Sequence, residues 1–261
     1  MYQEDINQLL KGARAKFTLY RQHPGGFFLS SILAGLYIGF GICFVFSLAG
    51  LLGGFLGTKV LMGFCFSVAL SLVVVAGGEL FTGNCLVMTL PLAKKELSLK
   101  NFLSLMAFCW LGNLMGSLLC ALFFLGSGLY SPGVQEAVLE AALLKTSLGF
   151  FPLLCRAILC NTLVCLAIWS CNRIKDGAGK ILMVILCIAC FFISGYEHSI
   201  ANMTLFFISA LGGGSIPLSA YVYNLLLATL GNFIGGAFLV ALPYLFIASK
   251  PDKSSNFKED L

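Results

Sequence analysis

The chain has 261 residues, of which 59% are hydrophobic and 10% are charged, and its net charge is +5. The mean hydropathy of +0.96 exceeds what any water-soluble domain of this size needs, which excludes the soluble classes of protein. No basic block is interleaved with exposed aromatic residues, which argues against nucleic-acid binding.

The chain begins with a polar segment, residues 1–26, in which apolar side chains recur at helical spacing. These are Ile6, Leu9, Leu10, Ala13 and Phe17. The pattern predicts a short amphipathic helix lying on the cytoplasmic face of a membrane. The first long apolar run begins too late for this segment to be a signal peptide.

Six apolar runs follow, and each has the roughly 20 residues that a helix needs to cross a hydrocarbon core about 30 Å thick. The runs cover residues 27–50, 60–92, 101–126, 152–171, 181–210 and 216–248. The second and fifth runs are longer than one simple span and have polar residues in the middle. We therefore predict an all-α membrane protein with a three-span repeat at 27–126, an extracytoplasmic connection at 127–151, a second three-span repeat at 152–248 and a cytoplasmic tail at 249–261.

The positive charges predict the orientation of the chain. Thirteen of the 16 Lys and Arg residues lie in the N-terminal segment, in the loops after the second and fourth runs, and in the C-terminal tail. Such an excess marks the cytoplasmic side, so both termini should be cytoplasmic. Because each half has three spans, the second half enters the membrane from the opposite side, and the repeat is inverted.

Two polar motifs interrupt the long runs, and they repeat each other. Gly78–Asn84 reads GELFTGN and Gly195–Asn202 reads GYEHSIAN, so each places a Glu five residues before an Asn. A Leu-Gly-Asn triplet follows about 30 residues after each motif, ending at Asn113 and at Asn232. Equivalent interruptions in two halves of a membrane chain are typical of a transporter or channel whose site lies where the two broken helices meet.

Ionisable side chains inside a membrane are costly, so each needs an explanation. Glu79 and Glu197 occupy equivalent positions, and we interpret them as structural groups whose carboxylates accept the backbone N–H groups freed by the breaks. Arg156 lies inside the fourth run. Its side chain pairs with one of these glutamates, forms another salt bridge within the bundle, or extends to the membrane–water interface.

His198 and Thr82 are the candidates for a functional site. A lone His is more often a satisfied core residue, but a broken membrane helix exists to line a cavity, and the imidazole can exchange a proton with a weak acid. Thr82 lies at the other break, where its hydroxyl either donates to an anion or caps the half-helix. No second His and no Cys or carboxylate cluster lies at ligand spacing, so we expect no metal, no cofactor and no enzyme.

The two motifs resemble the signature segments of the formate–nitrite transporter family, and the likeness covers the whole chain, including Cys160–Trp169. The amino-acid sequences of the motifs are most similar to those of bacterial nitrite channels, then to those of hydrosulfide channels and then to those of formate channels. The resemblance implies an aquaporin-like protomer of six helices, with helices 2 and 5 broken, that forms homopentamers in the bacterial cytoplasmic (inner) membrane. Its partners would be a small monovalent anion, protons and the lipid bilayer, with no nucleic acid.

The resemblance also implies roles for individual residues. Thr82 and His198 would form the central pore site. The remaining roles would be an outer constriction at Phe66 and Phe191, an inner constriction at Leu70, Leu80 and Phe81, attraction of anions into the vestibules by Lys16 and Lys145, and support of the helix breaks by Glu79, Asn84, Glu197 and Asn202.

The expected function is a channel, with or without proton coupling, for small monovalent anions of weak acids. Nitrite is the first choice, and formate and hydrosulfide are alternatives. Two other classes are a membrane-embedded enzyme, for which a second catalytic group is missing, and a water or glycerol channel, whose Asn-Pro-Ala pairs are absent.

Overall fold

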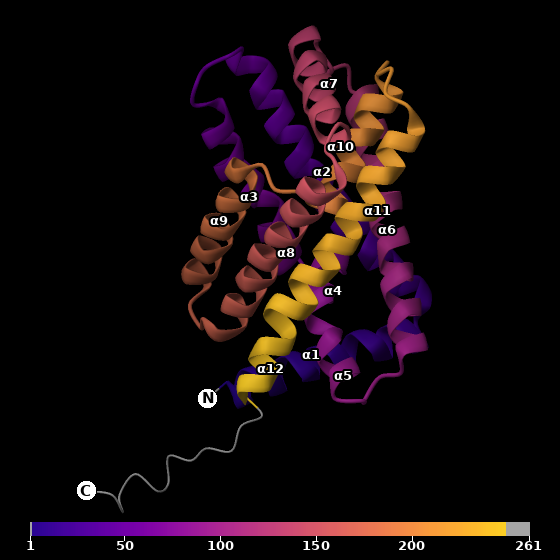
Figure 1. The fold of residues 1–261 in the computed structure, drawn as a ribbon, viewed down its shortest axis with the longest axis vertical. Coiled ribbons are helices and arrows are strands. Elements are labelled where there is room, and N and C mark those ends of the chain that lie inside the picture. Colours follow the sequence, from indigo (N-terminus) through magenta and orange to yellow (C-terminus); the bar gives the residue numbers. More distant parts are fainter. Residues whose placement is uncertain (1, 249–261) are drawn as a thin grey trace, which may run out of the picture.

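The computed structural model describes residues 2–248, and every regular element within that range is helical (Figure 1). The elements are α1 (Gln3–Gln22), α2 (Pro24–Leu52), α3 (Thr58–Val75), α4 (Phe81–Val87), α5 (Thr89–Ala93), α6 (Leu99–Gly126), α7 (Pro132–Thr146), α8 (Phe150–Arg173), α9 (Gly177–Ser194), α10 (Ser199–Leu211), α11 (Leu218–Gly236), a π-helical turn η1 (Ala237–Ala241) and α12 (Leu242–Ala248). The tail predicted at 249–261 lies outside the described residues.

Six of the described helices are long and apolar enough to cross a membrane. They are α2, α3, α6, α8, α9 and the continuous run Leu218–Ala248. Shorter apolar helices, Phe81–Ala93 and Ser199–Leu211, continue the second and fifth spans after interruptions at residues 76–80 and 195–198. The predicted six-span, all-helical membrane architecture is therefore confirmed.

Two helices outside these spans cover the two ends of the bundle. In Figure 1, α1 lies at the lower end beside α5 and α12, and α7 lies at the upper end. Helix α1 buries the apolar stripe that the sequence indicates, from Ile6 to Ala13. Helix α7 lies within residues 127–151, for which we predict only a connection from the sequence. Its signal is nevertheless present: Pro132 at the first turn and buried Val134, Val138 and Ala142 at intervals of four.

Glycines allow the first and third spans of each half to approach closely. A Cβ on Gly116 would clash with the carbonyl oxygen of Ile32, and a Cβ on Gly235 would clash with that of Ile158. Gly116 and Gly235 each follow another glycine, Gly112 and Gly231, by four residues, and this small-xxx-small spacing lets the two backbones touch. Gly53 also has a glycine four residues later, but it has open space around it and a φ of 41°, so it ends α2 and packs against nothing.

Candidate functional site

The first and second breaks are the interruptions at residues 76–80 and 195–198. At the second break, the imidazole of His198 caps the helix that follows. Gly195 ends α9 in the left-handed region with φ 75°, and His198 stands before the first residue of α10 with extended backbone. Its Nδ1 accepts the backbone N–H of Ala201 at 3.1 Å, so the side chain caps α10 in the way a Ser or Asp usually does. An Nδ1 that accepts carries no hydrogen, so the neutral ring has its hydrogen on Nε2.

The first break brings Thr82 to the same place from the other half of the chain. Thr82 Oγ1 lies 3.2 Å from His198 Nε2, and both residues are buried, with exposed fractions of 0% and 3%. Because Nε2 is the donor, the Thr82 oxygen accepts and its hydroxyl hydrogen remains available. The sequence also allowed Thr82 to be a cap on α4, but the hydrogen bond of its hydroxyl is to the imidazole. Two residues 116 positions apart thus form one uncharged polar pair.

The backbone freed by the breaks is satisfied by two asparagines from neighbouring spans. Asn113 accepts the N–H of Phe81 at 2.9 Å and donates to the carbonyls of Ser31 and Glu79 at 2.8 and 2.9 Å. The second half repeats this arrangement. Asn232 accepts the N–H of Ser199 at 2.8 Å and donates to the carbonyls of Ala157 and Glu197 at 2.8 and 2.9 Å.

Sequence reasoning assigned this capping to the glutamates and missed the asparagines, although both end the repeated Leu-Gly-Asn triplet. That detail of the interpretation was wrong. The reason is chemical. A side-chain amide both donates and accepts, so it can bond three backbone groups at once, whereas a carboxylate only accepts.

The two glutamates form ion pairs instead. Glu79 accepts from Lys16 at 2.7 Å and from Asn84 at 3.0 Å, so it joins α1 to the first break. Glu197 accepts from Lys145 at 2.8 Å and from Asn202 at 2.6 Å, so it joins α7 to the second break. Each half therefore has a lysine from a peripheral helix, a glutamate at the break and an asparagine in the half-helix.

Arg156 is not the counter-ion of either glutamate. Its side chain is exposed, and within residues 2–248 the structure records no ion pair for it. The backbone carbonyl of Arg156 accepts the N–H of Glu197 at 3.3 Å, which places it beside the second break. Arg156 also lines the cavity described next.

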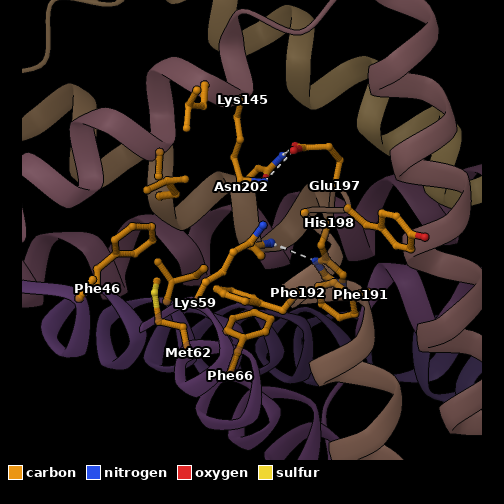
Figure 2. A pocket seen from close by; sticks show the side chains of 18 of the residues that line it. Phe46, Lys59, Met62, Phe66, Lys145, Phe191, Phe192, Glu197, His198 and Asn202 are labelled. Carbon is orange, nitrogen blue, oxygen red and sulfur yellow. Dashed lines mark hydrogen bonds and ion pairs between the residues drawn. The ribbon is translucent and has the colours of Figure 1, made fainter. Parts of the chain in front are cut away.

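A cavity of about 360 Å³ lies beside the second break, at the end of the bundle that α7 covers (Figure 2). Its lining includes His198, the Lys145–Glu197 pair and the rings of Phe66, Phe191 and Phe192. Phe66 lies edge-on to Phe191 with centroids 6.0 Å apart, and Phe191 stacks on the imidazole of His198 at 5.9 Å. The ring of Phe191 therefore lies directly beside the Thr82–His198 pair, where both it and His198 form part of the cavity wall.

The predicted inner-constriction residues are buried and do not line this cavity. Leu70 and Leu80 are 2% exposed and Phe81 is 6% exposed. Leu80 directly precedes α4 in extended conformation, and Phe81 is its first residue. Both follow Glu79 without a gap, so their placement depends on the same break as Thr82.

This geometry is that of a small polar site inside an apolar bundle. It has a hydroxyl and an imidazole N–H as donors, and the ring of Phe191 stacks on the imidazole. Within residues 2–248 no cluster of three or more His, Cys, Asp or Glu side chains could hold a metal ion. The donors suit a small anion or its conjugate acid.

Known proteins share this sequence and this fold. Residues 3–246 match the family model described as formate/nitrite transporter. The chain belongs to the formate/nitrite transporter family. It is 39% identical to the nitrite transporter NirC of Escherichia coli (strain K12) over 256 residues, which cover 97% of this chain and 95% of the relative.

Two solved structures have the same architecture. A structure described as an FNT family ion channel matches with a TM-score of 0.89 and 39% identity, covering 95% of this chain and 99% of the other. A pentameric formate channel with formate bound matches with a TM-score of 0.74 and 26% identity, covering 92% of this chain and 99% of the other. The family resemblance inferred from the motifs is confirmed. So is the prediction of a membrane anion channel and not an enzyme.

Proposed function

We propose that this protein conducts nitrite, as the monovalent anion or together with a proton, across a bacterial cytoplasmic membrane. Formate and hydrosulfide are the alternative substrates. The proposed assembly is a homopentamer of aquaporin-like protomers, each with its own pore formed by two inverted repeats and with both termini in the cytoplasm. The nitrite transporter at 39% identity favours nitrite, and the pentameric formate channel favours the assembly.

The Thr82–His198 pair is the observation that carries this proposal. A bare monovalent ion entering a low-dielectric interior faces a cost of order 20 kcal/mol. Two uncharged donors 3.2 Å apart, at the junction of two broken helices, replace part of the lost hydration without holding the ion by a fixed charge. Weak-acid anions are suited to such a site, because they accept hydrogen bonds and can also cross as the neutral acid.

The capping bond of His198 separates two modes of conduction. If the anion only accepts hydrogen bonds, Nε2 keeps its hydrogen and Nδ1 keeps its bond to Ala201. If the anion is protonated by Nε2, Nδ1 must take up a replacement proton from water, and the 3.1 Å bond from the Ala201 N–H is lost. The ring that exchanges protons therefore also uncaps α10.

Further roles are proposed for residues that lie along the pore away from the Thr82–His198 site. Phe66 and Phe191 would form an outer constriction, and Leu70, Leu80 and Phe81 an inner one, both of which restrict passage by size and dewetting. Lys16 and Lys145 would raise the local anion concentration at the two vestibules. Asn84 and Asn202 would hold Glu79 and Glu197, and through them the two breaks.

The test is transport by purified protein in liposomes. Stopped-flow swelling in isosmotic nitrite, formate, hydrosulfide and glycerol ranks the substrates, and we expect rapid swelling in nitrite and none in glycerol. His198→Asn keeps hydrogen bonding and removes titration, so proton-linked uptake should be abolished while a leak of bare anion remains. Swelling in glycerol alone would refute the proposal. A His198→Asn variant with unchanged rate and pH profile would refute the role of the imidazole.

A further inference from the structure

The charge of Lys145 in the cavity beside the second break, called the outer cavity below, is largely neutralised by its own partner. Its Nζ lies 2.8 Å from a carboxylate oxygen of Glu197, whose side chain is only 2% exposed. A buried pair at this distance acts as a dipole, and its field falls off much faster than that of a free charge. The attraction that Lys145 exerts on an anion in bulk water is therefore weakened, and further positive charge on this side of the protein would add to it.

Two further cations, Lys59 and Arg156, line the same cavity. Both are exposed, and among residues 2–248 neither side chain has a recorded ion pair or hydrogen bond. One more acidic residue, Glu140, lines the cavity, and it also lacks a recorded ion pair within that range. The cavity wall thus carries more positive than negative charge, and the excess comes from Lys59 and Arg156.

The fold places both cations beside the second break. Lys59 is in the first turn of α3, and its Nζ lies 3.6 Å from the point that a Cβ on Gly195 would occupy. Arg156 is in α8, and its carbonyl accepts the N–H of Glu197. Figure 2 shows Lys59 and Glu197 on different sides of the cavity, with the rings of Phe66, Phe191 and Phe192 gathered below His198.

We propose that Lys59 and Arg156 form an anion-capture site at the mouth of the outer cavity, ahead of the aromatic rings. This inference rests on the proposed function and adds a specificity to it. The guanidinium presents a planar fork of N–H donors that matches two coplanar oxygens, whereas the ammonium of lysine is a point charge. The site therefore favours small planar anions with two terminal oxygens, such as nitrite and formate, over the monatomic acceptor of hydrosulfide.

The test separates capture from conduction by measuring initial flux against substrate concentration. For Lys59→Gln combined with Arg156→Gln we expect the KM for nitrite to rise about tenfold at low ionic strength, at the lower end of the range for electrostatic steering, with unchanged maximal flux. The difference should shrink as salt shortens the screening length from about 30 Å at 0.01 M to ~3 Å at 1 M. Lys100→Gln removes an exposed charge that does not line the cavity and should leave the KM unchanged.

Arg156→Lys tests the specificity, because it keeps the charge and removes the fork. It should raise the KM for nitrite and formate about fivefold and leave that for hydrosulfide unchanged. A KM for nitrite that is equal in the parent and the double variant at low salt would overturn the capture site. Equal losses for nitrite and hydrosulfide in Arg156→Lys would overturn the specificity. Failure of the parent to conduct any of the three anions would instead refute the proposed function.

Discussion

Replacing Lys145 by Met should destabilise the protein strongly, because it leaves the carboxylate of Glu197 without its cation. The change removes the 2.8 Å ion pair and keeps a side chain of similar length. Glu197 would retain the amide of Asn202 at 2.6 Å and the longer contact from Asn224 at 3.4 Å. Two neutral amides do not offset the cost of a carboxylate that is 2% exposed.

The expected loss is about 3 kcal/mol of unfolding free energy. Removing one partner of a buried pair typically costs 3–5 kcal/mol, and the lower value applies because the side chain of Lys145 is itself 25% exposed. For a chain of this size, that corresponds to a fall of roughly 6–12 °C in apparent melting temperature. The second substitution Glu197→Gln should restore most of this loss, since it removes the unpaired charge and keeps an acceptor for Asn202.

Thermal unfolding of the detergent-solubilised oligomer, followed by size exclusion, measures the single variants and the double variant in one cycle. Lys59→Met is the matched control, because Lys59 is an exposed lysine of the same cavity without a recorded ion pair among residues 2–248. It should change the melting temperature by about 2 °C or less. A loss of less than 1 °C for Lys145→Met, or no recovery in the double variant, would show that the pair does not hold the second break.

Two further predictions concern the rings and the capping amides. Phe191→Ala removes a ring that stacks on His198 and contacts Phe66. It should raise the flux of nitrite and weaken the discrimination between nitrite and larger anions, measured by liposome swelling. An unchanged flux would place the constriction elsewhere. Asn113→Ala and Asn232→Ala each remove three buried hydrogen bonds. Both variants should therefore lower the free energy of unfolding by more than ~3 kcal/mol, and by similar amounts. A large loss for one variant alone would contradict their equivalent roles.

Much of the fold could be predicted because a membrane restricts what a chain can do. Long apolar runs can only be spanning helices, and a polar motif inside such a run must end one helix and begin another. For this reason the sequence predicts the six spans and the two interruptions. The repeat of the motif also indicated that Glu79 and Glu197 have equivalent surroundings, which the structure places beside Lys16 and Lys145.

The partners of those residues could not be predicted, because they come from other spans. The sequence shows that Asn113 and Asn232 are equivalent, but not which broken helix each one contacts. The prediction that the glutamates cap the breaks failed for this reason. Likewise, Lys59 and Arg156 are nearly 100 positions apart, and only the packing of α3 and α8 around the second break brings them to one cavity.

A fixed positive charge at the central site should turn the pore into an anion trap. Two unit charges 4 Å apart attract each other by about 4 kcal/mol at an effective dielectric constant of 20, which slows escape by roughly a thousandfold. A neutral hydrogen bond contributes only about 1 kcal/mol, so an ion held by Thr82 and His198 can leave. His198→Arg should therefore lower both the KM for nitrite and the maximal flux in liposomes. His198→Gln, which stays neutral, should keep most of the bare-anion flux. A higher maximal flux in the arginine variant would refute this argument, because release would then not limit conduction.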